Sequence, residues 1–211
     1  MNDPSKPAPW LKRAHHISGM LLIGYISMHL LNHLMILDSV QAHLDFMEVA
    51  RNVYRFPPVE ILLLMAVLFQ VGSGSRLLWT KWKVVDTIWD RLQVYTGAYF
   101  IYFLIAHPAA VLFGRYAMHL DTNLYYGAAV LNIDPLYYFF TLHYGLAIAA
   151  FFMHTACVHR IKMQAFVSQK NASWQASALI LVGIILSILI VSHMMGMSIP
   201  PEYLDGFGRS Y

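Results

Sequence analysis

Charged residues and cysteine are both scarce in this chain. Only 12% of its 211 residues are Asp, Glu, Lys or Arg, whereas 58% are hydrophobic; soluble domains carry about 25% charged residues. The single cysteine, Cys157, excludes an intrachain disulfide and an iron–sulfur cluster held by four cysteines of this chain. The glycine motifs that bind dinucleotides or nucleoside triphosphates are also absent. We therefore expect a membrane protein, with any enzyme chemistry carried largely by partner subunits.

Long apolar runs are abundant instead. A bilayer core of about 30 Å requires roughly 20 apolar residues in a helix, and five segments meet this length: 16–37, 57–79, 92–114, 135–159 and 175–198. The sequence predicts an all-α integral membrane protein, a single membrane domain over residues 1–211 with a bundle of five transmembrane helices. Two loops are longer than simple connections. Residues 38–56 are amphipathic and are expected to form a short surface helix, and residues 115–134 form the second loop.

Basic residues are distributed unevenly between the two sides that five spans would create. Ten lie at the N-terminus or in the loops after spans two and four: Lys6, Lys12, Arg13, Arg76, Lys81, Lys83, Arg91, Arg160, Lys162 and Lys170. Four lie on the other side: Arg51, Arg55, Arg115 and Arg209. The positive-inside rule then predicts a cytoplasmic N-terminus and an outer C-terminus in the cytoplasmic (inner) membrane. The net charge of +3 follows from this topology and does not indicate nucleic acid as a partner.

Histidines recur within four of the apolar segments, among them His29, His107, His143, His154 and His193. An ionisable side chain within a membrane is by default a hypothesis about function. At a helical rise of about 1.5 Å per residue, His29, His107 and His143 share a layer in the outer half of the membrane. A haem with two axial histidines requires imidazoles at equal depth on facing helices. His29 and His107 meet the depth condition, so the sequence predicts haem b as the cofactor.

Other residues could lie near the cofactor without binding its iron. His33 lies one turn beyond His29, where it would contact a haem propionate or a quinone, or else be an interfacial residue. His143 and His193 are expected beside the ligands or bonded to a helix backbone. Arg115 is expected to be a solvated loop charge, with propionate binding as the alternative. Two further histidines are expected to be ordinary loop residues: His43 and His119. Four glycines are expected to let a porphyrin approach the backbone: Gly19, Gly72, Gly74 and Gly97.

Three motifs carry a resemblance to a known family: SGMLLIGYISMHLLNH on the first span, TGAYFIYFLIAH on the third and HTACVHR on the fourth. The chain resembles the cytochrome b membrane anchor of succinate:quinone oxidoreductases and fumarate reductases, in its five-helix single-subunit form. The resemblance implies a haem-binding bundle that is itself non-catalytic. Such a subunit anchors flavoprotein and iron–sulfur subunits on the cytoplasmic side and transfers electrons between them and membrane quinone.

Carried over residue by residue, the resemblance makes His29 and His107 the ligands of the haem farther from the cytoplasm. It makes His154 a ligand of a nearer, second haem and Arg160 a partner of its propionates.

The second span departs from the family's pattern. The two-haem pattern has a histidine six residues before the basic residue that ends this span, and counting back from Arg76 gives Gln70. Glutamine is a poor haem ligand, so three interpretations remain. The second haem is absent, it uses His15 or His16, or Gln70 and His154 bond the carbonyl of a quinone.

Two other functions remain open from the residues alone. The outer histidines could cluster around iron, copper or zinc as a membrane metalloprotein, although Glu60 is the only acidic residue within a span. Alternatively, the chain is a non-catalytic membrane scaffold whose histidines bond across helices.

Overall fold

The computed structural model describes residues 7–207, which are helical without any strand. Five helices are long and apolar enough to cross a membrane, which confirms the five-span prediction. They are α1 (Pro9–Leu34, continued by the 3-10 turn η1, Met35–Leu37), α3 (Pro57–Trp82), α4 (Ile88–Tyr116), α6 (Leu136–Met163) and α7 (Gln169–Met194). Three shorter helices connect or follow them: α2 (Val40–Tyr54), α5 (Leu124–Ala129) and α8 (Pro201–Asp205).

The helices do not end where the apolar runs end. Helix α1 begins seven residues before the predicted span, and α7 ends at Met194 rather than at residue 198. The apolar run reports the part in contact with lipid, whereas capping groups define where the backbone becomes helical. Thr87 and Asp90 form a reciprocal capping box at the start of α4, and Ser168 accepts a hydrogen bond from the backbone of Asn171 at the start of α7.

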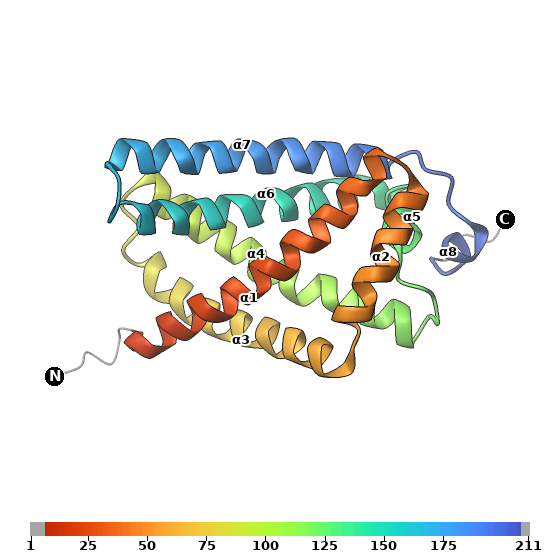
Figure 1. The fold of residues 1–211 in the computed structure, drawn as a ribbon, viewed down its shortest axis with the longest axis horizontal. Helices are drawn as coiled ribbons and strands as arrows, with labels where there is room; N and C mark the ends of the chain where they lie inside the picture. Colours follow the sequence, from red (N-terminus) through yellow and green to blue (C-terminus); the bar gives the residue numbers. More distant parts are fainter. Residues whose placement is uncertain (1–6, 208–211) are drawn as a thin grey trace.

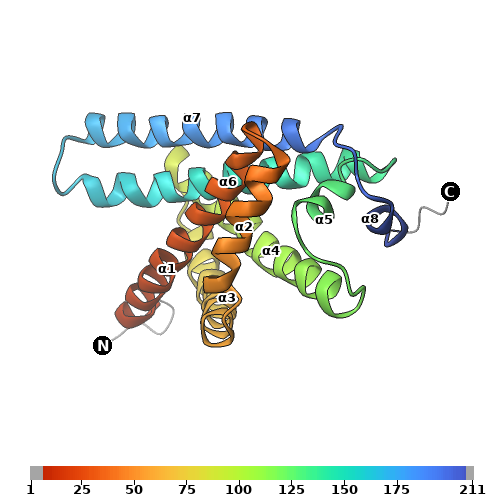
Figure 2. The same cartoon turned by 45° about the vertical axis from the view of Figure 1, so that its right-hand side comes forward.

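The short helices gather at one end of the bundle (Figure 1). Helices α2, α5 and α8 lie where α1 ends, and we call this the α2–α5 end. The start of α1 and the α3–α4 and α6–α7 connections lie at the opposite end. Helices α6 and α7 run side by side while α1 crosses the bundle obliquely, as Figures 1 and 2 both show. The predicted surface helix is confirmed as α2, and the second loop contains α5.

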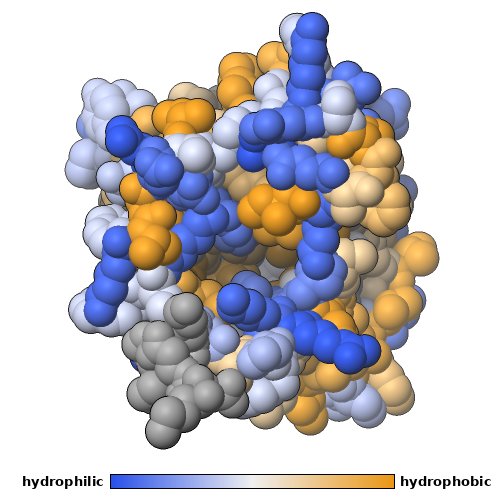
Figure 3. Space-filling view, turned by 90° about the vertical axis from the view of Figure 1, so that its left-hand side faces the viewer, coloured by the Kyte–Doolittle hydropathy of each residue, from blue (hydrophilic) through white to orange (hydrophobic). Residues whose placement is uncertain are grey.

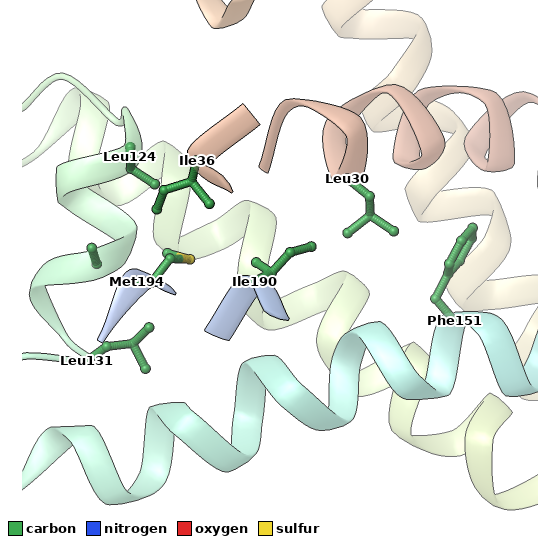
Figure 4. Packing of buried hydrophobic residues seen from close by; sticks show 8 residues of the cluster. Leu30, Ile36, Leu124, Leu131, Phe151, Ile190 and Met194 are labelled. Atoms are coloured by element: carbon green, nitrogen blue, oxygen red, sulfur yellow. The ribbon is translucent and has the colours of Figure 1, made fainter. Parts of the chain in front are cut away.

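A buried apolar cluster ties α5 to the bundle (Figure 4). Its members come from α1, η1, α5 and its following turn, α6 and α7: Leu30, Ile36, Leu124, Ala128, Leu131, Phe151, Ile190 and Met194. Several are almost inaccessible; Leu124 is 1% exposed and Ala128 is 0% exposed. The α2–α5 end is therefore packed onto the spanning helices.

The outer surface of the bundle suits a lipid environment. Large apolar side chains on the spanning helices are exposed, among them Leu68, Ile105, Leu142 and Ile188. Hydrophilic residues gather instead on the face at the opposite end, where α1 begins (Figure 3). A membrane-spanning bundle requires charged ends and an apolar surface around its middle, where it contacts lipid.

Candidate functional site

A cavity of about 290 Å³ lies among the spanning helices near the α2–α5 end. This volume is close to the lower end of the range of about 300–1,000 Å³ for cofactor and ligand pockets. Most of the wall is apolar, with side chains such as Leu22, Ile26, Leu63, Val67, Phe100 and Ala147. Four histidines also line it: His29, His33, His43 and His107.

His29 and His107 lie opposite each other on α1 and α4. Their ring centres are 6.1 Å apart and their planes are inclined by 55°. An imidazole nitrogen binds a transition metal at about 2 Å and lies about 1 Å from its ring centre, so two rings on opposite sides of one ion are about 6 Å apart. The depth argument placed these residues at one level, and the fold brings them onto facing helices. The spacing of the two ring centres is therefore compatible with one iron between them.

Aromatic neighbours hold both rings. Tyr25 is stacked on His29 with ring centres 6.0 Å apart and planes inclined by 12°. Phe103 is stacked on His107 at 5.0 Å and 10°. Because rings packed in this way have little rotational freedom, the two imidazoles are fixed in orientation before any ligand binds.

His33 and His43 extend the row of imidazoles towards α2. The ring centres of His29 and His33 are 4.7 Å apart, and those of His33 and His43 are 5.3 Å apart. Nδ1 of His33 and both ring nitrogens of His43 are buried without a hydrogen-bond partner among the described residues. Buried polar atoms in proteins are normally hydrogen-bonded, so these nitrogens indicate a site that receives a polar group from outside the chain.

The expectation that His43 is an ordinary loop residue is wrong. Its side chain is 2% exposed and lines the cavity. Burial, together with the neighbouring His29 and Arg51, lowers the pKa of His43 to about 4, so the ring is neutral at pH 7. The sequence does contain a signal, since His43, Met47 and Ala50 form the buried face of α2 and recur at the spacing of one helix face.

Charged groups line the cavity at the α2–α5 end. Arg115, expected to be a solvated loop charge, has a side chain only 20% exposed and lies 2.5 Å from Oε1 of Glu60. Arg55 also lines the cavity; its Nη2 donates to Oγ1 of Thr122 at 3.0 Å, and its Nη1 lies 3.8 Å from Oδ1 of Asp121. This end of the cavity is therefore polar and carries two guanidinium groups.

Tyr126 of α5 closes the same end. Its hydroxyl donates to the backbone carbonyl of Ala110 at 2.8 Å. A Cβ atom on Gly114 would lie 2.5 Å from the Tyr126 ring, so only glycine at position 114 allows this ring to pack against α4.

His143 and His193 do not line the cavity. The Tyr99 hydroxyl donates to the carbonyl of His143 at 2.8 Å and lies 3.1 Å from its Nδ1. The exposed His193 has Nδ1 2.8 Å from the carbonyl of Leu189 in its own helix. The His193 ring thus bonds a helix backbone, one of the alternatives expected for it, whereas the His143 ring bonds the Tyr99 hydroxyl.

Gln70 lies in a compact hydrogen-bond network in the half of the bundle towards the opposite end. Its amide nitrogen donates to the carbonyl of His15 at 2.6 Å and to Oγ of Ser18 at 2.9 Å. Nδ1 of His15 lies 2.8 Å from Oγ of Ser73. A Cβ atom on Gly19 would be 3.0 Å from the Gln70 amide nitrogen. Both amide hydrogens are thus already used within the chain.

His154 packs directly against α4. A Cβ atom on Gly97 would lie 3.2 Å from Cε1 of His154, and the ring hydrogen-bonds the backbone of Gln93. Its Nδ1 is buried without a partner among the described residues. Neither His154 nor Gln70 lines the cavity. The second haem that the resemblance implies near His154 therefore stays a prediction.

The basic residues predicted for that second haem lie near the bundle surface. Nε of Arg160 donates to Oγ of Ser173 at 2.9 Å, and its guanidinium lies 4.8 Å from the ring centre of Trp89. Arg76 is exposed on α3. Four glycines were expected to let a porphyrin approach the backbone, but none of them lines the cavity. They are Gly19, Gly72, Gly74 and Gly97.

Comparison of the chain with models of protein families, with curated proteins and with solved structures finds no match. Within residues 7–207, no group of three or more His, Cys, Asp or Glu side chains is arranged to hold a metal ion. A porphyrin, however, already supplies four nitrogens to its iron, so two axial imidazoles complete the coordination. The site suits a flat, largely apolar cofactor of this kind better than a bare ion.

Proposed function

We propose that the protein is a haem b-containing membrane subunit. It transfers electrons between a soluble dehydrogenase or reductase of the succinate/fumarate type and membrane quinone. The observation that carries the haem assignment is the pair of imidazoles, His29 and His107, with ring centres 6.1 Å apart in an apolar cavity. The choice of soluble partner rests on the family resemblance of the three histidine-containing motifs.

The chain's own residues have defined tasks in this proposal. His29 and His107 hold the iron as neutral imidazoles from two helices. Bound haem supplies reversible one-electron transfer, and its surroundings set the potential. Apolar walls from Leu22, Val67 and Ala147 exclude water and keep the dielectric constant low. Because His29 and His107 would both hold the iron, the site would be suited to electron transfer rather than to binding a substrate on the metal.

The orientation in the membrane belongs to the same proposal. The N-terminus lies in the cytoplasm and the C-terminus outside. Ten of the 14 Lys and Arg residues fall on the same side of the membrane as the N-terminus, and basic residues are enriched on the cytoplasmic side. The hydrophilic face in Figure 3 is then cytoplasmic. It is the surface on which flavoprotein and iron–sulfur subunits would dock, while quinone reaches the bundle from the lipid.

The test is a reduced-minus-oxidised spectrum of the full chain, purified in detergent together with any subunits that remain bound. We expect one protohaem per chain, which a soluble quinol reduces. The variant His29→Ala should lose the haem, whereas His193→Ala, which removes an exposed imidazole, should keep it. A protein purified without protohaem, or with haem that no quinol reduces, would overturn the proposal.

A further inference from the structure

We propose that Arg55 and Arg115 bind the two carboxylates of the porphyrin and so fix its carboxylate edge at the α2–α5 end of the cavity. This inference rests on the proposed haem site and adds to it the direction in which the cofactor lies. It assigns a ligand to two arginines that the imidazole pair leaves without a role.

Position is the first argument. Both arginines line the same cavity as His29 and His107, and they enter it from different elements, Arg55 from the α2–α3 connection and Arg115 from the last turn of α4. The rest of the wall is mostly apolar. A ligand with an apolar body and an anionic edge therefore matches the cavity in only one orientation.

Unsatisfied donors are the second argument. Nε of Arg55 and Nε of Arg115 are both buried without a hydrogen-bond partner among the described residues. Guanidinium groups bind carboxylates through paired, charge-assisted hydrogen bonds, which are stronger than neutral ones. Nε of Arg51 is also without a partner among the described residues, but Arg51 does not line the cavity. The donors beside the cavity that two carboxylates would use are therefore those of Arg55 and Arg115.

Charge balance is the third argument. The charged side chains that line the cavity are Arg55, Glu60 and Arg115, so their sum is +2 − 1 = +1. Beside them Arg51 and Asp121 form an ion pair at 2.8 Å and add no net charge. Burial lowers the pKa of Arg55, as do the neighbouring Arg51 and Arg115. Asp121 lies 3.8 Å from Arg55 but only 2.8 Å from Arg51, so a bound carboxylate would give Arg55 a closer anionic partner.

The ligand class follows from these observations. A quinone presents neutral carbonyl groups and has no need of a buried cationic pair. A porphyrin with two carboxylates presents an apolar plane to the walls, an iron to the imidazoles and an anionic edge to the arginines.

The test compares iron protoporphyrin IX with its dimethyl ester, which lacks both charges. The full chain is produced without haem, purified in detergent and titrated with each porphyrin. We expect the wild type to bind the free acid at least about tenfold more tightly than the ester, which corresponds to about 1.4 kcal/mol. Arg55→Gln and the double variant Arg115→Gln/Glu60→Gln should each lose most of this preference; the double variant avoids leaving Glu60 unpaired.

Arg51→Gln is the matched control. Arg51 lies one helical turn from Arg55, pairs with Asp121 and does not line the cavity, so this variant should keep the preference. Equal binding of acid and ester by the wild type, with two axial imidazoles in both spectra, would refute the carboxylate site and leave the haem site intact. If Arg51→Gln lost the preference for the free acid to the same extent, the carboxylate site would also be refuted, because the preference would then come from long-range charge. If neither porphyrin acquires two axial imidazoles, the proposed function itself fails.

Discussion

The two halves of the bundle differ in how their polar side chains meet. Towards the opposite end, Gln70 bonds the His15 carbonyl and the Ser18 hydroxyl directly, and one imidazole nitrogen there, Nδ1 of His154, is buried without a partner among the described residues. Towards the α2–α5 end, His33 and His43 keep buried nitrogens without partners around an apolar cavity. This difference shows that a histidine inside a membrane helix does not by itself form a ligand-binding site. A ligand site forms where imidazoles meet across a space and still have donors and acceptors to offer.

The largest effect expected from this comparison is on haem content. His107→Ala removes one of the facing imidazoles and should abolish tight haem binding. His154→Ala removes an equally deep histidine of the other half and should leave one haem per chain. The pyridine haemochrome assay on purified protein measures both. Loss of haem in both variants, or in His154→Ala alone, would contradict the assignment of the haem site to the α2–α5 end.

Gln70→Met tests the hydrogen-bond network of the half towards the opposite end. The substitution keeps the side chain's length but removes the amide that serves the His15 carbonyl and Ser18. Leaving buried groups unsatisfied destabilises a protein by about 1–3 kcal/mol, so the thermal midpoint in detergent should fall while haem content is unchanged. Gln175→Met removes an exposed amide that bonds His159 and serves as the control, with an expected change within about 0.5 kcal/mol.

Acid should destabilise the other half through His43. Its pKa is about 4 in the folded chain and 6.5 for an unperturbed histidine, so the unfolded chain binds more protons between these values. Stability is complete above pH 6.5 and declines as the pH falls towards 4; at pH 5 the loss is about 2 kcal/mol. Unfolding of haem-free wild type and His43→Leu at pH 7.5 and 5 measures this, and the variant should show a smaller drop. Identical drops would remove His43 as the cause.

The smallest expected effect is an increase in the free energy of unfolding. In the haem-free protein at pH 7.5, His43→Leu replaces an imidazole whose nitrogens lack partners by an apolar side chain of similar size. Removal of an unsatisfied buried polar group should raise the free energy of unfolding by about 1 kcal/mol. Thermal unfolding compares it with Gln70→Met under the same conditions. A decrease in both variants would mean that the two halves do not differ as described.

Much of the fold could be predicted from the sequence, because apolar length reports membrane crossing directly. The five spans and helix α2 were predicted in this way, whereas α5 was not, since its six residues are stabilised by packing on Leu30 and Met194 rather than by a pattern of their own. Helix ends were misplaced where caps such as Thr87 extend the helix into polar sequence.

The candidate site was only partly predictable. Depth along a helix follows from counting residues, and this brought His29 and His107 to the same level. The direction of a side chain around its helix depends on which helices are neighbours, and the sequence does not contain that information directly. Arg55 was therefore missed, and so was the close packing of the His154 ring against Gly97.

The axial ligands of the oxidised iron test the central claim most directly. Low-temperature electron paramagnetic resonance, combined with near-infrared magnetic circular dichroism, of the purified full chain identifies them. The account predicts a single low-spin haem with two imidazole ligands, lost when either His29 or His107 is replaced by methionine and regenerated with the wild-type residue. A high-spin iron, or a two-imidazole signal that survives both replacements, would contradict it.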